Sequence, residues 1–204
     1  KEIAEQPETI IAAIGGRVDF RSYKIDLPEI NLTKKQLTAI NRIILVGMGT
    51  SLHAGMAGAH MIEALSGIPA VAENSSEFRY RNPVLSSDTL VISIGQSGET
   101  VDTLAAMEQA KGKKAKILTI CNTDNSQATR LADGWISMRA GLEIGVAATK
   151  TFVNTLVSLY LFASYLGNQK NYLADSFLKN AAESLAKLPD QIGQIIKERQ
   201  VYLD

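Results

Sequence analysis

Cysteine is almost absent from this sequence, since Cys121 is the single one among 204 residues. One cysteine excludes a disulfide within the chain and a metal site built from cysteines, and it fits a reducing cytoplasm. Cys121 ends an apolar run, and no neighbouring base is identifiable, so we interpret it as buried rather than nucleophilic. His53 and His60 are the only histidines, and neither has an acidic or cysteine partner at metal-ligand spacing. We therefore expect no metal site.

An excess of charge of one sign is also missing. The chain has 21 basic and 21 acidic residues and a formal net charge of zero. This balance gives no general attraction to nucleic acid or to an anionic membrane surface, so neither is expected as a partner. If the protein binds an anion, the binding must come from local geometry.

Long apolar runs are missing too. The most apolar stretch, residues 152–166, contains two serines, an asparagine and a threonine, and it is shorter than the roughly 20 residues that a membrane span needs. We interpret it as a buried helix and expect part of its apolar surface to be covered from outside this chain. Residues 1–12 show no signal-peptide pattern, which favours a cytoplasmic protein.

Short apolar runs alternate with helical patterns through the middle of the chain. Strands are predicted at 42–47, 69–72, 90–93, 116–121 and 134–138, and helices at 50–66, 77–80, 99–111 and 127–131. This alternation predicts an α/β fold: a five-stranded parallel sheet flanked by helices, a flavodoxin-like three-layer sandwich. Ligands bind such sheets at the carboxyl ends of the strands.

The two ends of the chain have a different pattern. Residues 1–32 predict a helix, ended by Gly15 and Gly16, and a surface loop over 17–30 that lacks a clear period. A short helix over 34–41 opens the α/β domain, which we place at 33–168. Helices are predicted at 149–167, 172–188 and 189–202, with Pro189 starting the last; 169–204 is the C-terminal helical extension.

The stretch from 89 to 103 carries the clearest functional signal. A β-branched apolar run leads into a small polar turn, Gly95-Gln96-Ser97-Gly98, and then into a helical pattern that begins with Glu99. Free backbone N–H groups and the helix dipole make an anion site at such a junction. Ser97 and Thr100 add hydroxyl donors, so we expect a phosphate here. Glu99 would repel that phosphate, and we interpret it as a structural residue that faces away.

A second strand ends in a similar turn, Gly47-Met48-Gly49-Thr50-Ser51. A dinucleotide fold would have a third glycine at position 52, where this chain has Leu52. Glu73 stands where a ribose-binding carboxylate is expected, which keeps NAD binding open as a weaker alternative. A third loop, residues 140–150, should reach the same edge of the sheet, and its Lys150 either contacts an anion or is solvated.

At these loops the chain resembles the sugar isomerase (SIS) domain family, and most closely the first SIS subdomain of the glucosamine-6-phosphate synthases, the glutamine–fructose-6-phosphate aminotransferases. The residues that carry the resemblance are 47–51, 76–81, 96–104, 120–122 and 140–150, and residues 1–7 also resemble a segment of those enzymes. The resemblance implies a fold of the SIS type and a sugar phosphate ligand, fructose 6-phosphate or glucosamine 6-phosphate. It implies no cofactor, and we expect a homodimer.

The resemblance also implies how the three turns are used. The phosphate would be held by the turn at 95–98 and the start of the helix that follows it. The sugar would lie against the turn at 47–51, and the loop at 140–150 would form an edge of the pocket. The implied substrate-binding residues are Gly49, Thr50, Ser51, Gly95, Gln96, Ser97, Gly98, Thr100, Val146 and Ala148. Gly95 and Ala148 depart from the family, which often has hydroxyl residues there, and each loses a side-chain donor.

The family's catalytic groups lie in a second SIS subdomain, and its glutaminase uses an N-terminal cysteine; neither part has a counterpart in these 204 residues. We therefore assign no catalytic residue and expect binding without turnover. The leading hypothesis is a sugar-positioning part of a glucosamine-6-phosphate synthase. A stand-alone module that senses a phosphosugar is the second hypothesis, and a dinucleotide-binding domain is the third.

Overall fold

The computed structural model describes residues 1–202, and within that range the side chains of Gln200 and Tyr202 are not described. Five parallel strands form the central sheet: β3 (Arg42–Gly47), β4 (Ala70–Asn74), β5 (Thr89–Gly95), β6 (Lys116–Cys121) and β7 (Gly134–Ser137). Their order is β4-β3-β5-β6-β7, and every neighbouring pair is parallel. The predicted five-stranded parallel sheet is confirmed.

Alternate residues of the strands enter two separate cores, one on each face of the sheet. In β3, Ile43 and Leu45 belong to the larger core, whereas Ile44 and Val46 belong to the smaller one. Both sets are fully buried, which explains why β3 reads as a continuous apolar run rather than an alternation. Each face of the sheet is therefore packed against a hydrophobic core.

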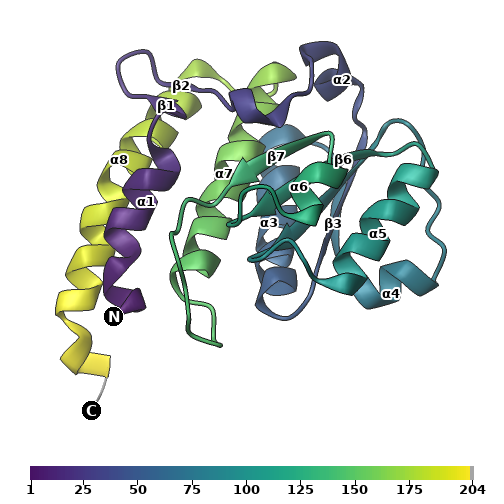
Figure 1. Cartoon of the computed structure of the whole chain (residues 1–204). Coiled ribbons are helices and arrows are strands. Elements are labelled where there is room, and N and C mark those ends of the chain that lie inside the picture. The colour runs from purple at the N-terminus through teal and green to yellow at the C-terminus, as the bar shows by residue number, and fades with distance from the viewer. Residues whose placement is uncertain (203–204) are drawn as a thin grey trace.

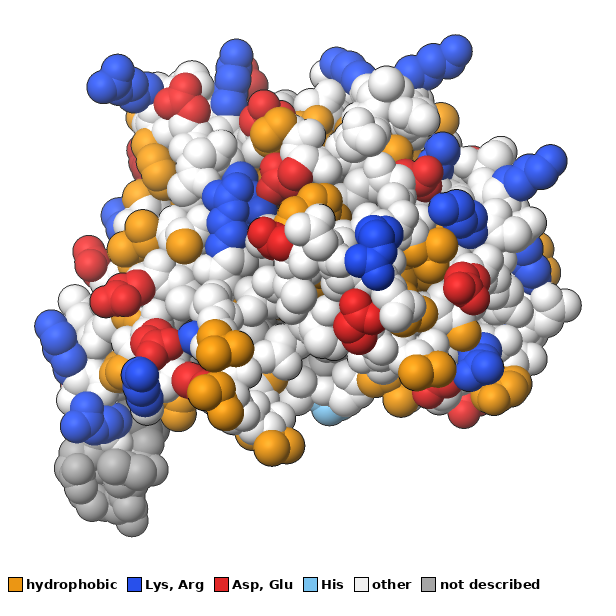
Figure 2. Space-filling model, viewed as in Figure 1, with side chains coloured by type: hydrophobic (Ala, Val, Ile, Leu, Met, Phe, Trp, Pro, Cys, Tyr) orange, Lys and Arg blue, Asp and Glu red, His pale blue; other side chains and the backbone are white. Residues whose placement is uncertain are grey.

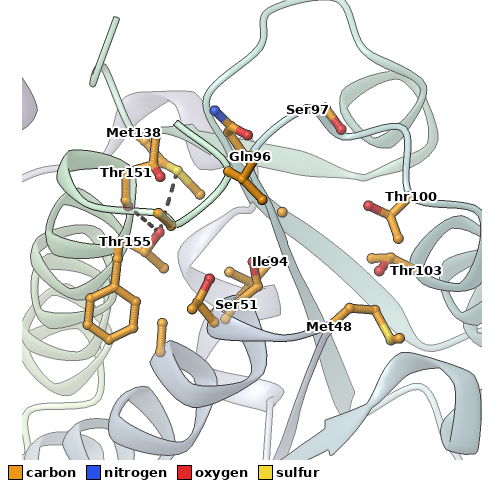
Figure 3. Close-up of a pocket in the computed structure, with 16 residues that line it drawn as sticks. Met48, Ser51, Ile94, Gln96, Ser97, Thr100, Thr103, Met138, Thr151 and Thr155 are labelled. Atoms are coloured by element: carbon orange, nitrogen blue, oxygen red, sulfur yellow. Dashed lines mark hydrogen bonds between the residues drawn. The ribbon is translucent and has the colours of Figure 1, made fainter. Parts of the chain in front are cut away.

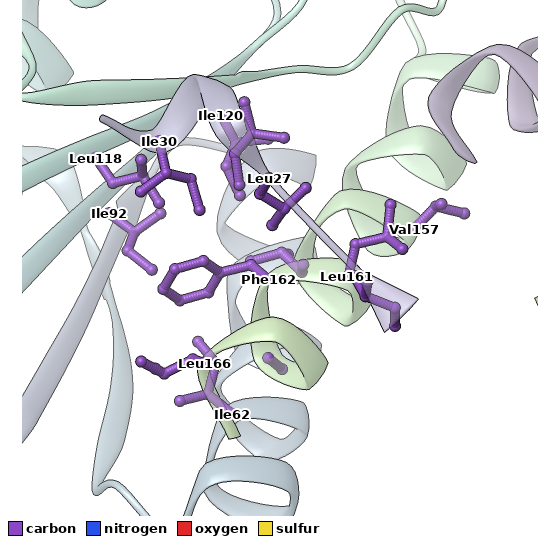
Figure 4. Packing of buried hydrophobic residues seen from close by; sticks show 14 of the residues in the cluster. Leu27, Ile30, Ile62, Ile92, Leu118, Ile120, Val157, Leu161, Phe162 and Leu166 are labelled. Atoms are coloured by element: carbon purple, nitrogen blue, oxygen red, sulfur yellow. The ribbon is translucent and has the colours of Figure 1, made fainter. Parts of the chain in front are cut away.

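Different helices cover the two faces. The smaller core is closed by α4 (Ser75–Tyr80), α5 (Val101–Gly112) and α6 (Gln127–Leu131). The larger core is closed by α2 (Lys34–Ala39), α3 (Thr50–Ser66) and α7 (Lys150–Gln169). The result is the expected three-layer sandwich, with Phe162 of α7 reaching toward the sheet beside Ile92 and Ile62 (Figure 4).

Two further helices form an outer layer on the side of α7. They are α1 (Gln6–Ile14) and α8 (Asp175–Lys197), which lie side by side at the left of Figure 1. Short 3-10 helices complete the chain: η1 (Glu2–Glu5), η2 (Pro28–Ile30) and η3 (Arg199–Tyr202). Because α3 and the sheet lie on one side of α7 and α1 on the other, no residue of α7 is exposed. Most of its apolar surface is therefore covered within this chain. Whether a partner covers the partly buried remainder stays a prediction.

The C-terminal helices also differ from the prediction. A single helix, α8, lies where two helices are expected at 172–188 and 189–202; it runs from Asp175 to Lys197, and Pro189 lies inside it. A proline within a helix removes one hydrogen bond and costs about 3 kcal/mol. Leu185, Leu188 and Ile192 pack on the larger core on both sides of Pro189, and this burial offsets the cost.

The segment expected to be a surface loop contains a small hairpin. Strand β1 (Val18–Asp19) pairs antiparallel with β2 (Lys24–Ile25). The Asp19 carboxylate accepts backbone N–H groups from Arg21 and Ser22 and thereby fixes the turn. Two-residue strands are too short to give a readable period, which explains the error.

Nearby, Arg17 is buried and anchors this segment to the domain. Its guanidinium pairs with Glu29 and donates to the backbone oxygens of Ala13 and Ser137. No helix within residues 1–202 is long and apolar enough to span a membrane.

Candidate functional site

The strand order places a switch point between β3 and β5, because the chain moves outward from β3 to β4 and then returns to the other side of β3. At such a point the loops after two neighbouring strands diverge and leave a crevice at the carboxyl edge of the sheet. A pocket of about 210 Å³ opens there. Its lining comes from the turn after β3, the turn after β5, and the segment that joins β7 to α7 (Figure 3).

Eight of the ten substrate-binding residues predicted from the sequence line this pocket: Thr50, Ser51, Gly95, Gln96, Ser97, Thr100, Val146 and Ala148. The other two, Gly49 and Gly98, lie beside it and shape its turns. Gly98 has a φ of +68°, and a Cβ at this position would collide with the Ser126 side chain. The three loops singled out from the sequence, at 47–51, 95–98 and 140–150, therefore meet at one pocket. That this pocket binds a ligand stays a prediction.

Two helices begin at this pocket without a side-chain cap. Gly49 precedes α3 and Thr100 precedes α5, and neither N-cap position supplies a side-chain hydrogen bond to its helix. The first N–H groups of a helix lack partners in the preceding turn of the helix, and the helix dipole places partial positive charge beside them. In α3 two of these groups, those of Ser51 and Leu52, donate instead to the backbone oxygens of Met48 and Gly49. The prediction of an open helix start at the phosphate turn thus agrees with the geometry, although α5 begins at Val101 rather than Glu99.

A third helix, α7, also begins beside the pocket, but its start is already occupied by an anion. The Glu143 carboxylate accepts the backbone N–H of Thr149 at 2.8 Å and that of Thr151 at 3.4 Å. Both threonine hydroxyls donate to the same carboxylate. Burial opposes ionisation of Glu143, but these hydrogen bonds together outweigh it and lower its pKa.

The hydroxyl groups around the pocket fall into two sets. Thr103, Thr151 and Thr155 are hydrogen-bonded inside the protein, to Ser75, to Glu143 and to the backbone oxygen of Thr151, respectively. Within residues 1–202, the hydroxyls of Thr50, Ser51, Ser97 and Thr100 donate to no protein group; the Ser97 oxygen accepts the N–H of Glu99 at 3.2 Å. The second set is available to a ligand.

Among residues 1–202, no titratable side chain lines the pocket. Beyond the predicted residues, the lining consists of Met48, Ala54, Ile94, Thr103, Met138, Thr151, Phe152 and Thr155. This second group was not predicted from the sequence. A spacing of four between Thr151 and Thr155 puts both on one helix face, but nothing in the sequence says that this face turns toward the pocket.

The remaining candidate residues lie outside the pocket. Glu99 is exposed and accepts the N–H of Gln127 at the start of α6, which confirms that it is structural. Lys150 is neither solvated nor bound to an open anion site: it is buried and pairs with Glu5 at 2.6 Å. Glu73 accepts two hydrogen bonds from Arg81, so the carboxylate that a dinucleotide would need is already paired.

Cys121 is buried, as expected, and burial raises the pKa of its thiol. His53 and His60 are exposed on α3. Within residues 1–202 no group of three His, Cys, Asp or Glu side chains has the arrangement needed to hold a metal ion.

Curated relatives of this chain include several glutamine–fructose-6-phosphate aminotransferases. The glutamine–fructose-6-phosphate aminotransferase (isomerizing) of Clostridium tetani is 39% identical over 98% of this chain, and the match covers 33% of that protein. Its counterpart from Mycolicibacterium smegmatis is 42% identical over 96% of this chain and 31% of that protein. The chain thus spans about a third of the length of these curated relatives.

Solved structures give the same picture. The C-terminal domain of glucosamine-fructose-6-phosphate aminotransferase from Francisella tularensis superposes with a TM-score of 0.86 at 35% identity, over 93% of this chain and 52% of that one. Glucosamine-6-phosphate deaminase from Thermotoga maritima has a TM-score of 0.69 at 18% identity over 93% of this chain and 52% of that one, a likeness of fold alone. The family model described as "SIS domain" matches residues 36–165, more than half of the sequence, and the chain therefore belongs to the SIS domain family.

Proposed function

We propose that this chain binds a hexose phosphate in the pocket between β3 and β5, and that it is the sugar-positioning part of a glutamine–fructose-6-phosphate aminotransferase. The observation that carries the proposal is the start of α5, which has no side-chain cap, beside four hydroxyls that have no acceptor within residues 1–202. At the start of α3 the N–H groups of Ser51 and Leu52 already donate to the backbone oxygens of Met48 and Gly49, so α3 contributes mainly its dipole. Free N–H groups, a helix dipole and hydroxyl donors together bind phosphate. The names of the relatives supply fructose 6-phosphate as the ligand, with glucosamine 6-phosphate as the product that the same site would hold.

The phosphate belongs at α5 rather than at α7, because the Glu143 carboxylate already occupies the start of α7 and would repel a second anion. In this arrangement Ser97, Thr100, Gln96 and the backbone of Gly95 and Gly98 surround the phosphate. Gly49, Thr50 and Ser51 contact the sugar, and Val146 and Ala148 close the opposite side.

The pocket positions its ligand without transforming it. Isomerisation and amino transfer both require proton transfer by a group of suitable pKa. None of the lining residues within the described range, 1–202, is titratable. The role that fits is binding and orientation, which lowers the entropic barrier of a reaction whose acid and base come from elsewhere.

Calorimetric titration of the 204-residue chain tests the proposal. Fructose 6-phosphate should bind, and fructose should bind at least about tenfold more weakly because it lacks the anion, a difference of about 1.4 kcal/mol. NAD should give no heat of binding. Binding of NAD without binding of fructose 6-phosphate would contradict the proposal.

We also propose a cytoplasmic location and a homodimer. The unpaired Cys121 favours a reducing compartment. Support for the homodimer comes from exposed apolar side chains, Tyr80 and Val101, that flank the Arg79–Asp102 ion pair between α4 and α5. Sedimentation equilibrium at several concentrations should show a dimer; a monomer at every concentration would remove this part of the proposal.

A further inference from the structure

The loop between β7 and α7 forms one wall of the pocket, yet burial of its own side chains does not hold its outer part in place. Leu142, Ile144 and Val146 are 80%, 81% and 106% exposed. Figure 2 shows orange side chains at the lower edge of the molecule, where Figure 1 places this loop. Because exposed side chains contribute no hydrophobic anchoring, something else must fix the positions of Val146 and Ala148.

The first anchor is Glu143, whose side chain points inward while its neighbours point outward. It is 7% exposed, and its carboxylate ties the loop to the first turn of α7 through Thr149 and Thr151. Its backbone oxygen also accepts the side-chain N–H of Gln96 at 3.2 Å, which links the loop to the turn after β5. Glu143 thus connects the loop between β7 and α7 to the turn after β5, where the phosphate is proposed to bind.

The second anchor comes from the far end of the sequence. The Glu2 carboxylate, on η1, accepts the backbone N–H of Ile144 at 2.6 Å and that of Gly145 at 3.2 Å. A Cβ at position 145 would lie 2.7 Å from Glu2 Oε2, so a side chain there would displace the Glu2 carboxylate from its present position. The ion pair of Glu5 with buried Lys150 holds the same N-terminal helix against the start of α7.

We propose that Glu143 and Glu2 are positioning residues of the phosphosugar site: they hold the loop so that Val146 and Ala148 lie at the correct distance from the α5 turn. This inference rests on the function proposed above. Neither carboxylate lines the pocket, so each acts through the backbone of the loop. The N-terminal segment and the pocket are thereby coupled, since displacement of η1 would release Ile144 and Gly145.

Two isosteric variants test the inference, Glu143→Gln and Glu2→Gln, with Glu183→Gln on the exposed face of α8 as the matched control. Each chain is titrated with fructose 6-phosphate and with inorganic phosphate, which needs only the α5 turn. Both variants should bind fructose 6-phosphate about tenfold more weakly and inorganic phosphate within about twofold of the unmodified chain. The control should match the unmodified chain for both ligands.

Amide hydrogen exchange supplies a readout that does not depend on the ligand. In Glu2→Gln the amide protons of Ile144 and Gly145 should exchange about tenfold faster, while those of the sheet keep their rates. Unchanged exchange, unchanged affinity for fructose 6-phosphate, or an equal loss for both ligands would overturn the inference.

Because Glu2 is only half-buried, Glu2→Gln disturbs the fold less than Glu143→Gln. If Glu143→Gln does not fold, Glu2→Gln alone decides the test. If the unmodified chain binds no fructose 6-phosphate, the proposed function itself fails, and the positioning role fails with it. If the unmodified chain binds and the variants bind equally well, only the present inference fails.

Discussion

At the scale of single residues, the pocket is defined by which hydroxyls are already satisfied. Thr103, Thr151 and Thr155 are used to hold the protein together, whereas Thr50, Ser51, Ser97 and Thr100 keep free donors. The sequence points to the second set because a strand, a small polar turn and a helix start mark a free helix end. It does not reveal the first set. Thr103 and Thr151 bond to Ser75 and Glu143 on other segments, and no local signal shows that the hydroxyl of Thr155 turns back to the oxygen of Thr151.

Ser97 tests the role of the free hydroxyls. Its oxygen accepts the N–H of Glu99, which leaves the O–H to donate to a ligand. Ser97→Ala should weaken fructose 6-phosphate binding by roughly 1–3 kcal/mol, because a hydrogen bond to a charged phosphate is lost. Titration calorimetry measures the change, with Ser176→Ala on α8 as the control. An unchanged dissociation constant in a folded Ser97→Ala chain would remove Ser97 from the site.

The reactivity of the Cys121 thiol reports how tightly the end of β6 is packed. Burial raises the pKa of the thiol, so at about pH 7 the side chain is both protonated and inaccessible. A thiol reagent should label the native chain only as fast as the surrounding structure opens, and should label the urea-unfolded chain at once. Rapid labelling of the native chain would mean that this end of the sheet is open.

At the scale of elements, the predicted bounds of β3, β6 and α3 agree with the observed ones because each has a strong period and a clear stop. Gly67, with a φ of +67°, ends α3. The errors fall where local signals and tertiary packing disagree. Pro189 is a local stop signal that burial overrides, and the hairpin of β1 and β2 depends on a turn rather than on a period.

Arg17 shows how a short, irregular segment is secured. Arg17→Met would leave Glu29 and the backbone oxygens of Ala13 and Ser137 without their buried donor. Breaking such a buried pair should destabilise the fold by about 3–5 kcal/mol. Urea unfolding measures the loss, and Arg21→Met, at an exposed position, should change stability by no more than about 0.5 kcal/mol. A loss of less than about 1 kcal/mol for Arg17→Met would contradict this account.

The loop before α7 should make stability depend on pH. The pKa of Glu143 lies below its ordinary value of 4.5 in the folded chain. Folding therefore favours the ionised form, and its contribution is complete above about pH 4.5 and is lost as the pH falls through the lowered pKa. Glu143→Gln should cost about 1.5–3 kcal/mol near pH 7, and the difference from the unmodified chain should shrink toward about pH 3. Urea unfolding at each pH measures this difference in stability. A difference that stays constant between about pH 7 and about pH 3 would contradict an ionised, hydrogen-bonded Glu143.

At the scale of the whole molecule, strand order determines where the site lies. The alternation of strands and helices predicts the parallel sheet, but it does not say which strand is central; only the observed order β4-β3-β5-β6-β7 puts the switch point between β3 and β5. That order brings together loops that begin at Gly47, Gly95 and Ser137. The starts of α3 and α5 face one pocket because of this strand order, and neither sequence motif alone shows it.

The whole chain should bind its ligand without converting it. Incubation with fructose 6-phosphate and ammonia should yield no glucosamine 6-phosphate, because no titratable group lines the pocket. Detection of the amino sugar by mass spectrometry, above the level of a reaction without protein, would show that a catalytic group reaches the site from elsewhere in the chain.

A crystal structure of the chain with fructose 6-phosphate tests the central claim most directly. The phosphorus should lie at the first turn of α5, within hydrogen-bond reach of Ser97 and Thr100, and the sugar should extend toward Thr50 and Ser51. An empty pocket at saturating ligand, or a phosphate bound away from the start of α5, would contradict the account.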